Sequence, residues 1–291
     1  MKIHTVPAGV AKQPVAKYLQ RAWPMLPGWV IRDAMKTKSV RINGVKSGAE
    51  ATVSAGDELK IYILDQYFEA PLEVIYEDSE LLVVNKPAGL PVDADQKHVG
   101  ADTLKTRVQA RCPTAQLCHR LDTGTSGVVL CAKIAQAHEQ LLKAFASHEL
   151  RKKYICIAAG KLPYENQTLK AYLRKDAGAA RVQVLDHPSA GAQEIRTQYK
   201  LLESFQAKGV TLSRLEVTLI TGRTHQIRAH LAHVDHPLLG DDKYGDRALN
   251  KKFAGGICLH AAELTLLGNE VPDKWVGMTF KCPAPQWISG K

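Results

Sequence analysis

One segment of the chain places an acidic side chain in a glycine-containing loop, directly before a strongly apolar run. Within residues 119–127, Asp122 precedes Gly124 and Gly127, and the apolar residues 128–132 follow. Because glycine allows tight backbone turns, this loop can hold the carboxylate at the mouth of a sheet. A carboxylate there can act as a nucleophile, as a general base or as the anchor of a salt bridge. The residues alone favour the structural salt bridge and leave the two catalytic roles open.

A second polar segment, residues 221–231, follows a predicted strand that ends at Ile220. Thr224 is typical of a helix N-cap, and apolar residues at intervals of three and four predict a helix over 224–234. His225 and Arg228 are three residues apart, so their side chains leave this helix on nearly the same side. A guanidinium in that position can pair with a carboxylate and keep it ionised.

A third segment, Arg151–Ile155, joins a basic cluster to a predicted strand. Tyr154 is either an ordinary core or edge aromatic, or a stacking face and phenol inside a pocket. The residues leave both roles open.

Three histidines lie close together in the sequence, at positions 230, 233 and 236. Helical zinc ligands usually lie four residues apart with a glutamate between them, and that glutamate is missing here. We therefore expect surface or capping histidines and no metal site.

Short apolar runs that predict strands dominate the chain after about residue 72, and helical patterns interrupt them only at 134–146 and 224–234. Strands and helices do not alternate strictly, which argues against a doubly wound parallel sheet. We expect an α+β fold with a mostly antiparallel mixed sheet. The predicted strands cover residues 72–76, 81–84, 128–130, 154–157, 182–184, 197–202 and 215–220.

Residues 10–65 predict a smaller unit, in which two short helices precede strands that turn at Asn43-Gly44, a strong hairpin signal. The order helix, helix, Val-Arg-Ile-Asn-Gly and then Ala-Gly-Asp-Glu-Leu before a last strand resembles the S4 RNA-binding domain. The resemblance implies that the basic second helix faces RNA, although a solvated helix face would show the same pattern. The RNA-binding candidates are Arg32, Lys36, Lys38 and Arg41.

The composition is that of an ordinary globular protein, with 45% hydrophobic and 23% charged residues. The sequence contains no apolar stretch of membrane-spanning length and no apolar signal core at its start, so we expect a cytoplasmic protein. The six cysteines include no Cys-x-x-Cys pair and are predicted to be reduced, mostly buried thiols. The net charge of +10 divides into +5 over residues 1–65, −6 over 66–102 and +11 over 103–291. This distribution fits two surfaces that attract a polyanion, although a basic protein with no specific partner would also carry such a charge.

Several motifs occur together in a fixed order, and the set resembles the RluA-type pseudouridine synthase family over roughly residues 70–285. Ile220 departs from the pattern, because that family carries an acidic residue there. An N-terminal S4-like domain is a common companion, so the expected domains are residues 1–65, a linker over 66–75 and a catalytic domain over 76–291. The matching motifs are His119-Arg120-Leu121-Asp122 with Thr125-Ser126-Gly127, Asn85–Gly89, Lys153-Tyr154, Gly222–Arg228, His236–Asp241 and Leu259-His260-Ala261.

The resemblance implies an enzyme that isomerises uridine in RNA to pseudouridine and needs no cofactor. It makes Asp122 the catalytic carboxylate, Arg228 its charged partner and Tyr154 the ring that packs on uracil. Arg120 would occupy the space that the flipped base leaves. The remaining expected substrate- or RNA-binding residues are Lys86, His119 and Arg223.

The expected partner is structured RNA, most specifically large-subunit ribosomal RNA. We expect the protein to be a monomer that does not bind a membrane. Transfer RNA is the alternative substrate, because both substrate classes share one catalytic signature. A non-catalytic RNA-binding protein of ribosome assembly that kept the fold is the alternative from a different functional class.

Overall fold

The computed structural model describes residues 1–23, 26, 28–64, 68, 72–93, 102–176, 181–253 and 255–287, apart from the side chain of Trp29. Half of the predicted linker over 66–75 lies outside these residues. The chain forms two compact units, which we describe separately. Unit 1 comprises Met1–Leu72 and Asp93–Arg107, and unit 2 comprises Glu73–Val92 and Val108–Lys291.

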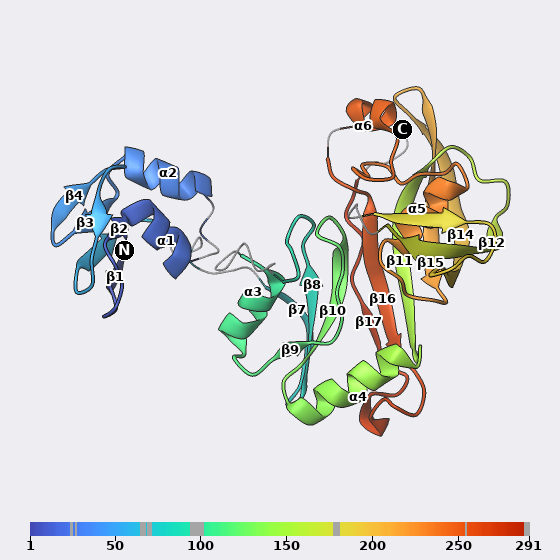
Figure 1. Ribbon diagram of the computed structural model, residues 1–291, viewed down its shortest axis with the longest axis horizontal. Helices are drawn as coiled ribbons and strands as arrows, with labels where there is room; N and C mark the ends of the chain where they lie inside the picture. The colour runs from blue at the N-terminus through green and yellow to red at the C-terminus, as the bar shows by residue number, and fades with distance from the viewer. Residues whose placement is uncertain are drawn as a thin grey trace. The chain divides into compact units, whose positions relative to one another are not determined.

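Unit 1 combines a small antiparallel sheet with two helices (Figure 1). The sheet has the strand order β1-β6-β3-β4, and β2 and β5 form a separate pair. Val15, Tyr18 and Leu19 of α1 are buried, because their spacing of three and four residues places them on one helical face. Asn43 and Gly44 have φ angles of 50° and 85°, as a two-residue hairpin turn of type I′ requires. The elements are β1 (Lys2–Thr5), β2 (Gln13–Pro14), α1 (Val15–Ala22), α2 (Gly28–Lys36), β3 (Val40–Ile42), β4 (Val45–Ser47), β5 (Thr52–Val53) and β6 (Glu58–Ile61), and α3 (Leu104–Arg111) spans the boundary to unit 2.

An 11-stranded sheet is the scaffold of unit 2 (Figure 1). Its main path runs β13-β12-β14-β15-β11-β16-β10-β8-β7, while β17 pairs with β16 and β9 pairs with β10. Among the described strands the pairing is antiparallel except between β10 and β16. The predicted α+β fold with a mostly antiparallel sheet is therefore confirmed for this unit.

Most predicted strands and the helix over 134–146 appear at their expected positions. Two long strands, β12 and β16, were not predicted, and they complete the path of the sheet. The elements of unit 2 are β7 (Glu73–Glu77), β8 (Leu81–Lys86), β9 (Gln116–Leu117), β10 (Ser126–Ala132), α4 (Ala135–Ala146), β11 (Leu150–Ala159), β12 (Asn166–Lys175), β13 (Val182–Leu185), β14 (Gln193–Ala207), β15 (Val210–Leu219), α5 (Gln226–His233), α6 (Arg247–Lys252), β16 (Leu259–Leu266), a short 3-10 helix (Asp273–Trp275) and β17 (Thr279–Lys281).

Strands β8 and β10 lie deep in the core of unit 2. Every residue of β10 is buried, as are the first four of β8. The buried face of α4, formed by Ala137, Leu141 and Ala144, packs into the same cluster as Leu130 and Trp275. Burial on both faces explains why these strands show continuous apolar runs rather than alternation.

Gly127 permits the single parallel pairing, opposite Ala261 of β16. Its φ angle is 115°, and a Cβ atom there would lie 2.2 Å from the carbonyl oxygen of Ala261. Only glycine fits this close approach, so the start of β10 and the preceding loop are held against β16.

All six cysteines are free thiols. Five of them are buried and Cys112 is partly buried, as the sequence predicts. Among the described residues, no helix is long and apolar enough to cross a membrane.

Candidate active site

The loop that carries Asp122 rests on a buried lysine. Lys86, at the end of β8, is completely inaccessible to solvent. Its ammonium donates hydrogen bonds to the carbonyl oxygens of Pro87 (3.0 Å), Leu90 (2.7 Å) and Thr123 (3.0 Å). Burial lowers the pKa of Lys86 to about 8, and the negative charge of Asp122 opposes this shift. The ammonium thus fixes the backbone beside Asp122 through the Thr123 carbonyl.

Arg228 divides its guanidinium among three carboxylates. Its Nη1 donates to Oδ2 of Asp122 at 3.1 Å, and its Nε donates to Oδ2 of Asp241 at 2.7 Å. Its Nη2 donates to Oδ1 of Asp241 at 2.8 Å and to Oδ1 of Asp242 at 2.9 Å. Burial disfavours the charged form of Arg228, but hydrogen bonds and charges from Asp241 and Asp122 outweigh burial and raise its pKa.

Asp241 is the anchor of this arrangement. Its side chain is 0% exposed, whereas that of Asp242 is 80% exposed. Besides the two bonds from Arg228, Asp241 Oδ1 accepts the backbone N–H groups of Lys243 (2.8 Å) and Tyr244 (2.9 Å). Burial alone would raise the pKa of Asp241, but the hydrogen bonds from Arg228 and these N–H groups lower it. The bidentate pair fixes the guanidinium plane and leaves Nη1 for Asp122.

His225 approaches the same carboxylate from the start of α5. Its Nε2 lies 3.8 Å from Asp122 Oδ1, and its Nδ1 lies 2.9 Å from the Tyr244 hydroxyl. That hydroxyl also accepts the backbone N–H of Val182 at 2.8 Å. Burial lowers the pKa of His225, while the charge of Asp122 opposes the shift. His225, Arg228 and Asp122 therefore converge, as the spacing of the first two predicts.

The prediction that Thr224 caps this helix is wrong. The N-cap residue is His225, which has a left-handed φ of 55° and no capping hydrogen bond from its side chain. Instead, the amide of Gln226 secures the turn, and no motif in the sequence marks this role. Its Oε1 accepts from the Thr221 hydroxyl and from the Arg223 N–H group, both at 3.0 Å.

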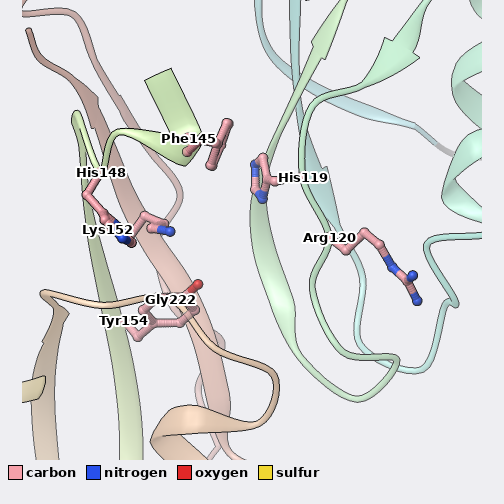
Figure 2. Close-up of a pocket in the computed structure, with 8 residues that line it drawn as sticks. His119, Arg120, Phe145, His148, Lys152, Tyr154 and Gly222 are labelled. Carbon is pink, nitrogen blue, oxygen red and sulfur yellow. The ribbon is translucent and has the colours of Figure 1, made fainter. Parts of the chain in front are cut away.

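Tyr154 lies on β11 and borders a pocket of about 330 Å³ (Figure 2). Its side chain is buried, and burial raises the pKa of the phenol, with a further contribution in the same direction from the charge of Asp122. The residues that line the pocket are His119, Arg120, Phe145, Ala146, His148, Lys152, Tyr154 and Gly222.

His119 packs its ring against Phe145, with 4.7 Å between the ring centroids. Its Nε2 accepts the backbone N–H of Leu130 at 3.0 Å. Burial lowers the pKa of His119 to about 3, and the positive charge of Lys152 acts in the same direction. His119 is therefore a neutral residue that ties the Asp122 loop to β10.

The comparisons with known proteins agree with each other. The family model described as RNA pseudouridylate synthase matches residues 80–233. Ribosomal large subunit pseudouridine synthase C of Rickettsia felis is 31% identical, over 92% of both chains. The chain belongs to the RNA pseudouridylate synthase family.

Further comparisons support membership in this family. Ribosomal large subunit pseudouridine synthase D of Xylella fastidiosa is 32% identical over 83% of this chain and 74% of that protein. The solved structure of human RNA pseudouridylate synthase domain containing 1 is 25% identical and has a TM-score of 0.63. That match covers 74% of this chain and 84% of the human chain. As a pseudouridine synthase, the protein is an isomerase that acts on RNA.

Several sequence-predicted residues of this pseudouridine synthase meet at one place. Arg228 contacts Asp122, whose charge acts on Tyr154, and Lys86 lies beneath the loop rather than at the surface. Arg120 is exposed, and its guanidinium points away from the other labelled side chains in Figure 2. Arg223 is exposed beside the turn that Gln226 holds. The candidates in unit 1 are the exposed Arg32, Lys36 and Lys38 and the partly buried Arg41.

The three histidines at 230, 233 and 236 bind protein groups. His230 is buried and lies 2.9 Å from the Thr197 hydroxyl, so its expected surface or capping place is wrong. His233 pairs with Asp186 at 2.8 Å, and His236 Nδ1 bonds the Ala159 carbonyl oxygen at 2.9 Å. Within the described ranges, no group of three or more histidine, cysteine or acidic residues is arranged to hold a metal ion.

Proposed function

We propose that this pseudouridine synthase modifies specific uridines of large-subunit ribosomal RNA and that Asp122 is its reacting carboxylate. The names of the two curated relatives support this choice of RNA. The observation that carries the assignment of Asp122 is its 3.1 Å contact with Arg228, together with the effect of its charge on the pKa of Tyr154. The Asp122 side chain is 28% exposed, so a substrate can reach a carboxylate that Arg228 orients.

The reaction breaks the N1–C1′ bond, turns the uracil and forms the C5–C1′ bond, while C5 loses a proton and N1 gains one. Asp122 can attack C1′, attack C6 or remove a proton. Each of these roles requires its carboxylate to lie beside the uridine. Tyr154 provides the ring that packs on the uracil. The base must first leave its stack, which costs a few kcal/mol, and Arg120 occupies the space it leaves.

Release of tritium from RNA labelled at C5 of uridine tests the role of Asp122. We expect Asp122→Asn to lower the rate by more than about 10²-fold, because an amide is neither a nucleophile nor a base. Asp235→Asn is the matched control, since Asp235 is exposed and has a φ of 64°, a conformation that asparagine accepts. Equal rates for the wild type and Asp122→Asn would refute the assignment.

We also propose that residues 1–65 form an S4-like RNA-binding domain. Arg32 and Lys36 are four residues apart on α2, so both project from one side of the helix, and both are exposed. Lys38 and Arg41 extend the positive charge beyond the helix. Removing one cation that binds a phosphate should reduce the slope of log Kd against log salt by about 0.7 to 0.9. We expect the double variant Arg32→Met/Lys36→Met to reduce the slope, and an unchanged slope would contradict this role.

Mapping of pseudouridines in total RNA from a deletion strain tests the substrate class. We expect specific sites to disappear from large-subunit ribosomal RNA and to return with the wild-type gene. Loss confined to transfer RNA would overturn the proposed substrate. Full rescue of the deletion phenotype by Asp122→Asn would instead support the non-catalytic alternative.

A further inference from the structure

The pocket beside Tyr154 has an unbalanced charge. Lys152 lines it together with the neutral His119, while the guanidinium of Arg120 points away from the other labelled side chains (Figure 2), and neither aspartate nor glutamate is among the lining residues. Its volume of about 330 Å³ is at the lower end of the range for ligand sites. A cavity lined by a lysine ammonium and no carboxylate favours an anionic ligand.

Lys152 is the central cation of this pocket (Figure 2). Among the described residues its ammonium has no hydrogen bond and no carboxylate partner, and its contact is the face of Phe145 at 5.4 Å from the ring centroid. Burial lowers the pKa of Lys152. In contrast, Lys86 donates to three carbonyls and Arg228 to three carboxylates. A partly desolvated charge without a partner is costly, so an incoming anion would stabilise it.

The surroundings keep space open for this ammonium. A Cβ atom at Gly222 would lie 3.0 Å from the Nζ atom of Lys152, so glycine leaves room that a larger residue would fill. Phe145 is in the last turn of α4, and His148 follows the helix at a left-handed φ of 58°. Both residues line the same pocket as Lys152.

The position of Lys152 relative to Tyr154 indicates which anion would bind. The two residues are separated by one residue on β11 and line the same pocket, so their Cα atoms lie about 7 Å apart along the strand. This distance is comparable to one nucleotide step of an extended RNA strand. A uridine whose base packs on Tyr154 would therefore bring a neighbouring backbone phosphate to Lys152.

We propose that this pocket is a phosphate subsite, in which Lys152 binds the phosphodiester next to the target uridine. The proposal rests on the proposed function, because it places the substrate base at Tyr154. The site provides affinity and strand register for the nucleotide, and Asp122 remains the reacting group.

Salt-dependent binding tests the subsite. The probe is an in vitro transcript of large-subunit ribosomal RNA, and Kd is measured from 50 to 300 mM KCl. We expect Lys152→Met to weaken binding about 10-fold near 100 mM salt and to reduce the slope of log Kd against log salt by about 0.7 to 0.9. Lys152→Arg should retain both values, because it restores the charge.

Lys143→Met is the matched control. Lys143 is exposed on α4 and pairs with Glu139, and it does not line the pocket. Its replacement should change Kd less than 2-fold. An unchanged Kd and salt slope in Lys152→Met, with thermal unfolding like that of the wild type, would overturn the subsite.

Tritium release separates failure of the subsite from failure of the proposed function. If the wild type releases tritium and Lys152→Met changes kcat but neither Kd nor salt slope, Lys152 acts on Tyr154 and the subsite is refuted. If the wild type releases none from ribosomal RNA but the Lys152 salt effect persists, the phosphate contact stands and the proposed substrate fails. Rescue of KM by Lys152→Arg supports the subsite, because a packing role would not depend on charge.

Discussion

Replacing Asp241 with asparagine removes the anchor of Arg228 while changing the side-chain volume very little. Asp241 Oδ2 now accepts from Arg228 Nε at 2.7 Å. The asparagine Oδ1 can keep the bonds from the backbone N–H groups of Lys243 and Tyr244, so its NH2 group would face the guanidinium. Two donors would then oppose each other in a site where the Asp241 side chain is 0% exposed.

The expected decrease in stability follows from the burial of this pair. Removing one partner of a buried salt bridge costs about 3–5 kcal/mol. Arg228 keeps its contacts with Asp122 and Asp242, so the lower end, about 3 kcal/mol, applies to Asp241→Asn. For a unit of about 200 residues, this decrease corresponds to a fall in Tm of roughly 6–12 °C. The kcat for tritium release should also fall, because the guanidinium no longer has a fixed plane from which to orient Asp122.

Asp242→Asn is the control, since Asp242 also accepts from Arg228 Nη2 and the substitution removes the same charge. Its side chain is 80% exposed, so the decrease in stability should be less than about 1 kcal/mol. Thermal unfolding and single-turnover tritium release of both variants make the comparison. Equal Tm values for the two variants, or a wild-type kcat for Asp241→Asn, would show that Asp241 does not hold Arg228 for the reaction.

Three further substitutions test other parts of the site and the fold. Arg228→Lys should lower kcat more than about 10-fold, because one ammonium cannot reproduce the bidentate geometry; unchanged tritium release would refute this. Gly127→Ala should lower the free energy of unfolding by more than about 3 kcal/mol, because Gly127 has a φ of 115° and contacts Ala261. Gly191→Ala, which has open space around it, should lower it by about 1 kcal/mol. Urea unfolding measures both changes. Burial lowers the pKa of His230 to about 4, so between pH 6.5 and 4 the unfolded chain binds a proton that the native chain does not. The free energy of unfolding therefore decreases as the pH is lowered through this range. His230→Gln should reduce this decrease by up to about 1.4 kcal/mol per pH unit. Urea unfolding at pH 5 and pH 7 measures the change in the free energy of unfolding, and an equal change in the wild type and in His230→Gln would contradict this prediction.

The strands were predictable where hydrophobic pattern and local propensity agree. The apolar runs in 81–84 and 128–130 became the buried β8 and β10. The sequence of β16, Leu-His-Ala-Ala-Glu-Leu-Thr-Leu, is rich in helix-forming residues, but pairing with β11, β10 and β17 makes it a strand. Tertiary pairing overrides weak strand propensity, and single residues do not reveal such pairing.

The site was predictable to the extent that its chemistry lies in one segment. The spacing of His225 and Arg228 identifies groups that face a carboxylate, and the structure brings both to Asp122. The anchoring role of Asp241 was not predicted, because its contact with Arg228 depends on how the 238–245 turns fold back onto α5. The cap at Thr224 failed because Gln226 and Thr221 secure the turn in its place.

Two different carboxylates around Arg228 carry two different roles: Asp241 stabilises the buried guanidinium, and Asp122 is the proposed reacting group. If Asp122 alone neutralised the guanidinium, a protonation or movement of Asp122 during the reaction would leave a buried cation without a partner. Asp241 prevents this, because it neutralises the same cation from a fully buried position. In the proposed reaction, Asp122 can therefore exchange its contact with Arg228 for contact with the uridine, while the fold retains the stronger bidentate pair.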